Sequence, residues 1–253
     1  MFEVIILSIL QGIAEFLPIS SSGHLVLGRT LLGLGDVGMR LDICLHVGTL
    51  IAVFVFYFAV IRRILVDLEW FYLLKILVSA IPAGLVGVLF KDQLEVMFSS
   101  PRAVGFALIF TGIVLSLTRL LPKGEGDVSF GRALLMGLAQ AIAILPGISR
   151  SGMTLAAARA ARVEAEKSAE FSFLMSAPPI AGAAFLQIVK SVKGAEETAT
   201  SEPSWTLCII GAAVAALVGY AALKFMLRSL KSNGFWLFGP YCALAGAVTL
   251  LLA

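Results

Sequence analysis

The chain has 253 residues, of which 59% are hydrophobic and only 14% charged, and its mean hydropathy is +0.99. Soluble domains carry about 25% charged residues, so this composition excludes an ordinary soluble protein and predicts a polytopic membrane protein. The formal net charge of +3 is too small to indicate a nucleic-acid partner, and we expect no removable signal peptide because no basic segment precedes the first apolar run.

The first segment, residues 2–34, is apolar but interrupted. Gln11 and Glu15 stand four residues apart in it and so share one face of a helix. Pro18 then breaks the run, and the polar cluster Ser20-Ser21-Ser22-Gly23-His24 follows. Each half of the segment is too short to cross a bilayer, which takes about 20 apolar residues. Because broken backbone persists at membrane depth only beside protein or in a wet cavity, the segment predicts a re-entrant helical hairpin.

The same pattern returns in the second half of the chain. Residues 131–162 carry Gln140, then Pro146-Gly147, then Ser149-Arg150-Ser151-Gly152, and they predict a second re-entrant hairpin. With one inserted residue after the second proline, Ser21 aligns with Arg150. The six remaining apolar runs are each long enough for a transmembrane helix: residues 41–61, 72–90, 103–121, 168–189, 205–226 and 234–252.

This layout predicts an all-α membrane protein built as an inverted-topology repeat. A hairpin returns the chain to the side from which it came, and three spans is an odd number, so the second half enters the membrane from the opposite face. We expect a single membrane domain over residues 1–253, with repeat one at about 1–122 and repeat two at about 131–253. The two hairpin tips should then meet near the middle of the bilayer.

Lysine and arginine indicate the orientation, because loops rich in them stay in the cytoplasm. Twelve are expected on one face of the membrane: Arg62, Arg63, Lys75, Arg119, Lys123, Arg132, Arg159, Arg162, Lys167, Lys224, Arg228 and Lys231. Six are expected on the other: Arg29, Arg40, Lys91, Arg102, Lys190 and Lys193. We therefore expect a multi-pass protein of the inner (plasma) membrane. Its termini, its first hairpin and a loop at 193–203 should open to the periplasmic or external side.

The hairpin tips bring together the residues that could carry chemistry. Serines and backbone N–H groups at a helix start can cradle an anion. A guanidinium at the depth of Arg150 costs about 2.5–3.5 kcal/mol on insertion scales, so it needs an anion, either Glu15 or a ligand. Its planar fork suits two phosphate oxygens. Glu15, Ser21, His24 and Arg150 can thus supply a base, a nucleophile, an acid and a clamp for phosphoryl charge.

Other interpretations of these residues stay open. Glu15 and Arg150 could form a purely structural tie between the hairpins. An inverted repeat with broken helices is also typical of transporters, including a lipid flippase. Ser21 and His24 could serve an intramembrane serine protease, although Arg150 would then have no evident role with a peptide.

Three further features are expected to be structural. His46 lies in an apolar run and is expected to pack in the core, with Asp42 at i,i+4 as its partner. Glu170 is expected at the edge of a span. Buried thiols are favoured over disulfides or a metal site for the cysteines, which lack CxxC spacing: Cys44, Cys208 and Cys242.

At these motifs the chain resembles the undecaprenyl-diphosphate phosphatase family, the integral-membrane type associated with bacitracin resistance. Gln11 to Glu15 matches its (Glu/Gln)-x-x-x-Glu motif, and Ser20 to His24 matches its Ser-Ser-(Ser/Thr)-Gly-His motif. Pro146 to Gly152 matches its Pro-Gly-x-Ser-Arg-Ser-Gly motif. The resemblance extends along nearly the whole chain. It implies six transmembrane helices with two re-entrant hairpins, and hydrolysis of undecaprenyl diphosphate to the monophosphate and phosphate, which recycles the lipid carrier of cell-wall synthesis.

The resemblance also implies roles for single residues. By motif position Ser21 matches the proposed nucleophile, and Glu15, His24 and Arg150 match the other residues considered essential. Water activated by Glu15 is the alternative to Ser21. The remaining motif positions are expected to bind substrate: Gln11, Ser20, Ser22, Gly23, Gly147, Ser149 and Ser151.

The family further implies a divalent cation, Mg²⁺ or Ca²⁺, with Glu15 as the candidate ligand. Many members have Glu where this chain has Gln11, and a neutral amide is a weaker ligand for a hard cation. The expected partners are a polyprenyl diphosphate lipid and membrane lipid, with a homodimer as the protein assembly to consider. Membrane phosphatases of the phosphatidic-acid type are not favoured. They need a histidine after the Ser-Arg element, and this chain has only His24 and His46.

Overall fold

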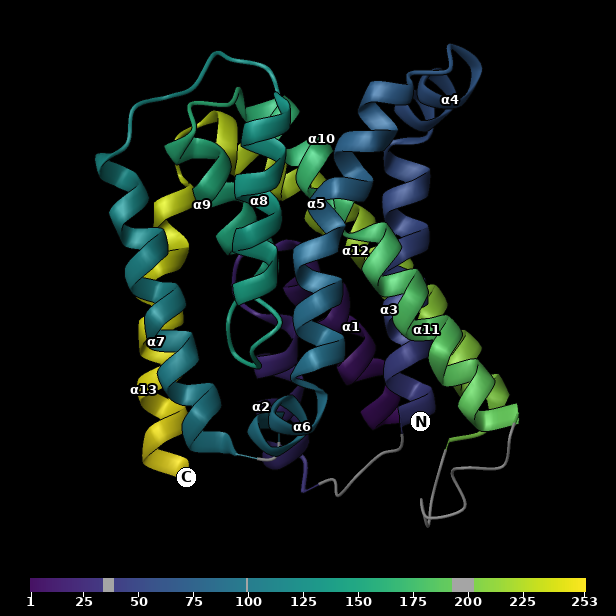
Figure 1. Cartoon of the computed structure of the whole chain (residues 1–253). Coiled ribbons are helices and arrows are strands. Elements are labelled where there is room, and N and C mark those ends of the chain that lie inside the picture. Colours follow the sequence, from purple (N-terminus) through teal and green to yellow (C-terminus); the bar gives the residue numbers. More distant parts are fainter. Residues whose placement is uncertain (34–38, 99, 193–202) are drawn as a thin grey trace.

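The computed structural model describes residues 1–33, 39–98, 100–192 and 203–253 (Figure 1). These residues are helical, without a β-strand among them. The α-helices in chain order are α1 (Phe2–Phe16), α2 (Ser21–Leu31), α3 (Met39–Phe56), α4 (Phe58–Val66), α5 (Trp70–Leu89), α6 (Lys91–Phe98), α7 (Pro101–Leu117), α8 (Phe130–Ile142), α9 (Arg150–Ala160), α10 (Ala165–Met175), α11 (Ala177–Val192), α12 (Trp205–Lys231) and α13 (Phe238–Leu252). Two short 3₁₀ helices are η1 (Thr118–Leu120) and η2 (Phe235–Leu237).

Two helical hairpins approach each other from opposite ends of the molecule. The pair α1–α2 starts at the end that holds both chain termini, and the pair α8–α9 starts at the other end (Figure 1). The 15 residues of α1 rise only about 22 Å, less than a bilayer core of about 30 Å. The tips touch: the Gly147 N–H donates to Ser22 Oγ at 3.3 Å, and Ser151 Oγ donates to the Leu17 carbonyl at 3.1 Å.

Four stretches of helix in the described ranges are long and apolar enough to cross a membrane: Trp70–Leu89, Pro101–Leu120, Trp205–Lys231 and Phe235–Leu252. A fifth exists if α3 and α4, which are bent by 70° at their junction, count as one span. The run predicted as a single span at 168–189 instead forms α10 and α11, which are separated at Ser176. Pro178 and Pro179 cause this break, because proline has no N–H to donate and fits only the first turn of a helix.

The helices of the two halves pack in a reciprocal order. Helix α1 packs along α12 and helix α8 along α5, while α7 packs against α13. Small residues allow these close contacts, as is common between membrane helices. A Cβ at Gly12 would lie 2.9 Å from the Ala215 carbonyl oxygen, and one at Gly137 would lie 2.4 Å from the Ser79 carbonyl oxygen.

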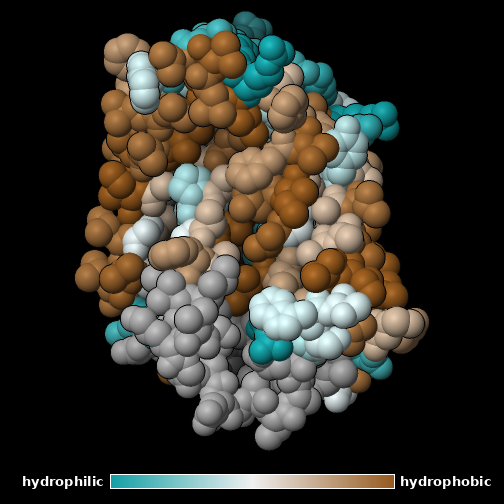
Figure 2. All heavy atoms as spheres, turned by 90° about the vertical axis from the view of Figure 1, so that its right-hand side faces the viewer, coloured by the Kyte–Doolittle hydropathy of each residue, from teal (hydrophilic) through white to brown (hydrophobic). Residues whose placement is uncertain are grey.

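The surface separates into an apolar middle and a polar end. Figure 2 shows a broad hydrophobic face below a hydrophilic upper rim. That rim is the end that holds α4 in Figure 1, and α4 carries Arg62 and Arg63. The loop predicted at 193–203 lies, apart from Pro203, outside the described residues.

The contact of α7 with α13 yields a stability prediction. A Cβ at Gly112 would lie 2.7 Å from the Gly239 carbonyl oxygen, whereas one at Gly84 would meet no atom within 4 Å. Gly112→Ala should therefore lower the unfolding temperature in detergent, at a cost of about 1–3 kcal/mol as for other overpacked sites. Gly84→Ala is the matched control, and it should leave the unfolding temperature unchanged or raise it. Equal unfolding temperatures for the two variants would show that α7 and α13 accommodate the added methyl group without strain.

Candidate active site

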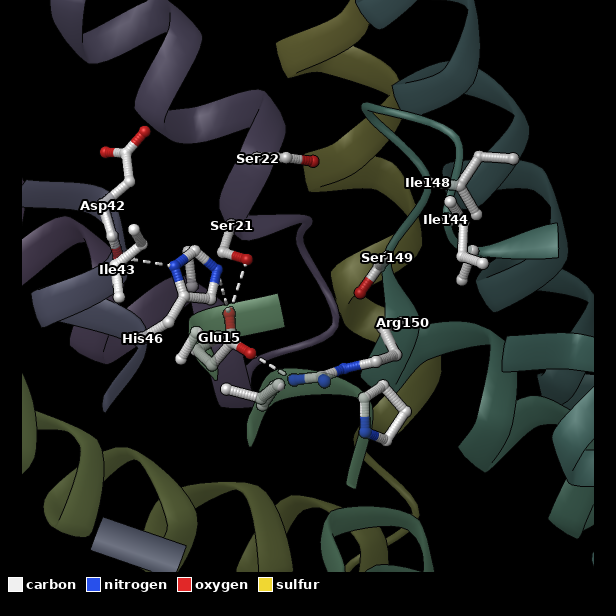
Figure 3. Close-up of a pocket in the computed structure, with 15 residues that line it drawn as sticks. Glu15, Ser21, Ser22, Asp42, Ile43, His46, Ile144, Ile148, Ser149 and Arg150 are labelled. Carbon is white, nitrogen blue, oxygen red and sulfur yellow. Dashed lines mark hydrogen bonds and ion pairs between the residues drawn. The ribbon is translucent and has the colours of Figure 1, made fainter. Parts of the chain in front are cut away.

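The buried carboxylate of Glu15 is the centre of the site. Helix α1 places Gln11 on the same face, and Gln11 Nε2 donates to Glu15 Oε2 at 3.0 Å. Ser21 Oγ donates to the same oxygen at 2.7 Å. The other oxygen, Oε1, accepts from Nη2 of Arg150 (Figure 3). The Glu15 side chain is only 4% exposed. The Ser21 hydroxyl and the Arg150 guanidinium, which were predicted to converge with Glu15 from the two tips, thus both contact its carboxylate.

The first tip is shaped by serine. Ser20 has a φ of 71°, a conformation that non-glycine residues rarely adopt. Its side chain accepts from the Gly23 N–H at 3.3 Å, which caps α2, and its carbonyl faces His24 Nδ1 at 2.9 Å. The surrounding bonds therefore hold the unfavourable backbone in place. As a result Ser21 is the first residue of α2 and points at Glu15.

The second tip has the same design. Gly147 has a φ of 92°, and a Cβ there would lie 2.6 Å from the Val104 carbonyl oxygen, so glycine is required. Ser149 caps α9 by accepting from the Gly152 N–H at 3.1 Å. Thr111 of α7 fixes the turn, because its hydroxyl donates to the Gly147 carbonyl and accepts from the Ser149 N–H. Arg150 is thus the first residue of α9 and faces Ser21, with which it aligns in sequence.

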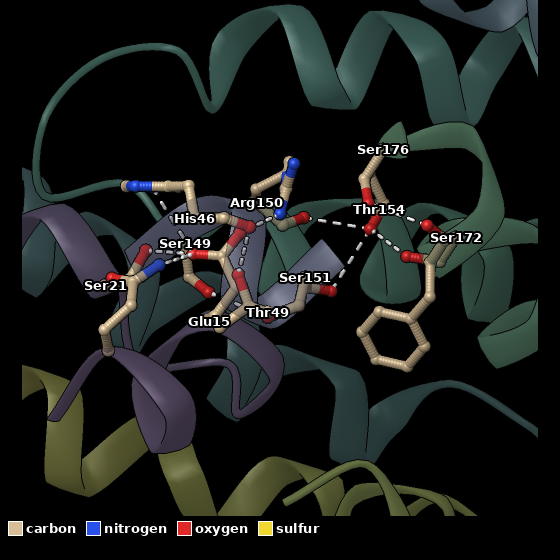
Figure 4. A network of polar contacts seen from close by, with 12 residues as sticks. Glu15, Ser21, His46, Thr49, Ser149, Arg150, Ser151, Thr154, Ser172 and Ser176 are labelled. Atoms are coloured by element: carbon tan, nitrogen blue, oxygen red, sulfur yellow. Dashed lines mark hydrogen bonds and ion pairs between the residues drawn. The ribbon is translucent and has the colours of Figure 1, made fainter. Parts of the chain in front are cut away.

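A chain of hydroxyl groups supports Arg150 from behind. Thr154 Oγ1 bonds the Arg150 carbonyl at 2.9 Å and lies 2.6 Å from Ser172 Oγ of α10 (Figure 4). Ser151 is buried and bonds the first tip through Leu17. These polar residues bond the start of α9 to both α1 and α10. They therefore fix the backbone position from which the Arg150 side chain extends. Serine and threonine inside helices gave no signal in the sequence that could assign this role.

His24 does not lie with this group. Its Nδ1 faces the Ser20 carbonyl, its Nε2 lies 2.7 Å from Tyr241 Oη, and its ring stacks on Tyr241 with 5.6 Å between centroids. The side chain is buried and is not among those that line the pocket in front of Glu15. The structure therefore gives His24 a bracing position between the first tip and α13, and its predicted part in catalysis stays a prediction.

His46 was expected to pack in the core, and this expectation was wrong. Its side chain is 36% exposed and lines the pocket, with Nε2 3.9 Å from Glu15 Oε2. Its Nδ1 bonds the Asp42 backbone carbonyl at 2.8 Å, while the Asp42 carboxylate pairs with Arg29 of α2. The i,i+4 spacing of Asp42 and His46 was the one available signal, since two polar side chains on one face of an apolar helix indicate a wet surface.

The pocket has a volume of about 600 Å³ and combines a polar end with apolar walls. Ser22 and Ser149 line it together with Glu15, Ser21 and Arg150. Its apolar walls come from α1, α3, α11 and the second tip: Ala14, Ile43, Ala143, Ile144, Ile148, Pro179, Ile180 and Ala184. The other residues predicted to bind substrate lie outside this lining: Gln11, Ser20, Gly23, Gly147 and Ser151. They build the tips and hold Glu15.

The donor set does not fit a divalent cation held by the protein alone. Such ions take six or more oxygen ligands, several of them carboxylate. Both oxygens of Glu15 are already bonded, and the Asp42 carboxylate is paired with Arg29. Among the residues that the structure describes, no three His, Cys, Asp or Glu side chains are grouped to share an ion. We therefore do not assign Glu15 as a ligand of a divalent cation.

Comparison with known proteins matches this chain to one family. The sequence profile described as bacitracin resistance protein BacA matches residues 4–248. An undecaprenyl-diphosphatase of Halothermothrix orenii is 41% identical over 100% of this chain and 98% of its own length. One of Desulfatibacillum aliphaticivorans is 38% identical over 98% of this chain and 97% of its own. A third, undecaprenyl-diphosphatase 3 of Bacillus cereus, is 39% identical over 99% and 96%. The chain belongs to the BacA family of bacitracin resistance proteins.

Proposed function

We propose that this chain hydrolyses undecaprenyl diphosphate to undecaprenyl phosphate and inorganic phosphate. Full-length relatives that are 36–41% identical carry the name undecaprenyl-diphosphatase. The observation that carries the proposal is the Ser21 hydroxyl, which donates to a buried carboxylate whose second oxygen holds a guanidinium. A hydroxyl beside its base and a planar cation is the arrangement that nucleophilic transfer of a phosphoryl group requires.

The first chemical step uses the three contacting residues. The diphosphate competes with Glu15 for the Arg150 guanidinium, which binds two phosphate oxygens as well as it binds a carboxylate. Glu15 is then free to accept the Ser21 proton. Ser21 Oγ attacks the terminal phosphorus, the bond from that phosphorus to the bridging oxygen breaks, and undecaprenyl phosphate leaves. Arg150 stabilises the charge that develops on the phosphoryl oxygens.

The apolar walls suit the lipid portion of this substrate. A diphosphate alone would need a polar cavity, but most of the pocket's lining side chains are aliphatic, including Ile144, Ile148 and Ile180. An isoprenoid chain attached to the diphosphate can pack on them while the phosphates reach Arg150 and Ser149. A divalent cation, Mg²⁺ or Ca²⁺, is proposed to arrive with the diphosphate, whose oxygens can supply the ligands that the protein does not.

The transporter alternative is less favoured. Translocation of an anionic lipid needs Arg150, but it has no use for a serine hydroxyl already bonded to a carboxylate. The names of the relatives also point to hydrolysis. An intramembrane protease is weaker still, because a peptide gives Arg150 no partner.

In the membrane, we propose six spans and two re-entrant hairpins related by an inverted repeat. The bent pair α3–α4 and the divided pair α10–α11 would each be one span. The reciprocal packing of α1 on α12 and α8 on α5 supports the repeat. The twelve-to-six division of Lys and Arg supports a cytoplasmic side at α4, and an active site that opens to the periplasmic or external side of the inner membrane. A homodimer stays a prediction.

Ser21→Ala should lower phosphate release from undecaprenyl diphosphate by several orders of magnitude, because the nucleophile is lost. Ser20→Ala and Ser22→Ala are the matched controls and should fall less. Residual activity above about a tenth would mean that less than about 1.4 kcal/mol of transition-state stabilisation was lost. That is too little for a nucleophile, and water activated by Glu15 would then replace Ser21 in the mechanism.

Arg150→Lys should lose most of the activity although the charge is kept, because an ammonium cannot hold two phosphate oxygens in one plane. Arg159→Lys, on the same helix but bonded to Leu121 and Asn233 at its far end, is the control and should stay near normal. Phosphate release in detergent is the measurement. Near-normal turnover of Arg150→Lys would mean that Arg150 acts only as a point charge or as a structural tie.

Orientation is testable by labelling. In a variant without the native cysteines, a cysteine at Gln93 of α6 should react with an impermeant thiol reagent from outside intact cells. A cysteine at Ser232, after α12, should react only after the cells are opened. Gln93 follows the apolar helix α5, and Ser232 follows the apolar helix α12. The reverse pattern would contradict the external opening of the active site.

A further inference from the structure

The two histidines of the chain differ in what their ring nitrogens can still do. Both nitrogens of His24 are bonded, one to the Ser20 carbonyl and one to the Tyr241 hydroxyl. His46 has one bonded nitrogen, and the other is directed at Glu15 and the pocket (Figure 3). His46 is therefore the histidine whose ring nitrogen can reach a molecule in the pocket.

The bond to Asp42 fixes which nitrogen of His46 carries the proton. A backbone carbonyl can only accept, so Nδ1 at 2.8 Å from the Asp42 oxygen must donate its N–H. The neutral ring then has its lone pair on Nε2. This atom lies 3.9 Å from Glu15 Oε2, too far for a hydrogen bond and within the range that one water molecule can bridge. Ser21 Oγ lies 2.7 Å from the same oxygen. A water between His46 and Glu15 would thus be next to the Ser21 oxygen.

While Glu15 holds the proton taken from Ser21, the second step of the proposed mechanism needs another base. Glu15 accepts the Ser21 proton when the phosphoserine forms, so it cannot also accept the proton of the water that cleaves this phosphoester. The other charged groups that line the pocket are unsuited, since Arg150 is a cation and the Asp42 carboxylate pairs with Arg29 of α2. Among the α11 side chains that the structure describes, those in the lining are apolar: Pro179, Ile180 and Ala184.

We propose that His46 is the base that activates water in this second step, an inference that rests on the proposed phosphatase function. The water oxygen attacks phosphorus, and its proton passes to His46 Nε2. The bond from phosphorus to Ser21 Oγ breaks, and Glu15 returns its proton to that oxygen. Inorganic phosphate leaves, and the imidazolium releases its proton to solvent. Ser21, Glu15 and His46 are then as they were before the first step.

His46→Gln tests this assignment directly, because it keeps a polar side chain of similar length but removes the base. With undecaprenyl diphosphate and purified protein in detergent, kcat should fall by about a hundredfold or more, the usual worth of a general base. KM should fall with it, so that kcat/KM changes little, because breakdown of the phosphoserine becomes the slow step. Acid-quenched samples should contain phosphoserine at residue 21 in this variant and far less of it in the unmodified protein. A merely structural role for His46 would not make the phosphoenzyme accumulate.

His24→Gln is the matched control, the other histidine changed in the same way. It should slow formation of the phosphoserine by loosening the first tip, so phosphoenzyme should not accumulate. Turnover of His46→Gln within about threefold of the unmodified protein would overturn the proposal. Slow turnover without phosphoserine would overturn it as well. Should His46→Gln fail to purify as a folded protein, His46→Asn is judged by the same two readouts.

A second-site variant adds an independent test. Gln11 Nε2 and His46 Nε2 approach the same oxygen of Glu15, at 3.0 and 3.9 Å. In the double variant Gln11→Glu/His46→Gln the new carboxylate could take the water's proton instead of the imidazole. The double variant should regain at least about tenfold in kcat over His46→Gln and lose the accumulated phosphoserine. Recovered turnover with phosphoserine still at its high level would contradict the proposal. Absence of phosphate release by the unmodified protein would instead refute the phosphatase function itself.

Discussion

The ion pair between Glu15 and Arg150 is the interaction on which the rest of the site depends. It joins the first hairpin to the second, and it is buried, with the Glu15 side chain only 4% exposed. Breaking such a pair by removing one partner leaves an uncompensated buried charge, a cost of about 3–5 kcal/mol. The pair therefore keeps the two tips together while no substrate is bound. A diphosphate offers Arg150 an equivalent anion, and Glu15, which loses its cation in this exchange, can then accept the Ser21 proton.

This exchange explains why the helices are interrupted where they are. An unbroken helix would bond every backbone N–H within itself and present only side chains to a ligand. The breaks after Pro18 and Pro146 instead start new helices at Ser21 and Arg150, in the middle of the protein. Their caps, Ser20 and Ser149, use their side chains to satisfy the first turns. The same serine-rich tips that stabilise the broken backbone thus aim the nucleophile and the guanidinium at one carboxylate.

Much of this site could be predicted from the sequence because it is local. The positions of Glu15, Ser21 and Arg150 follow from helix periodicity, a proline break and a repeated motif, and the buried cation demanded an anion. The places of His46 and Tyr241 could not be predicted in this way, because Glu15 and His24, which they approach, lie on other helices. Tyr241 is 217 residues from His24, which it contacts. The break between α10 and α11 was missed for a different reason: the mean hydropathy of residues 168–189 indicates a span, and it does not register how two adjacent prolines interrupt helical hydrogen bonding.

The proposed mechanism requires that Arg150 leaves Glu15 for the diphosphate and that Ser21 then lies opposite the terminal phosphorus. A structure with a lipid methylene-diphosphonate, whose P–C–P bridge cannot be cleaved by this chemistry, tests it most directly. We expect the guanidinium on two phosphonate oxygens, and Ser21 Oγ within about 3.5 Å of the terminal phosphorus and in line with its bond to the bridge. An analogue bound in the pocket with Arg150 still on Glu15 would contradict the claim, as would a terminal phosphorus on the far side of Arg150 from Ser21.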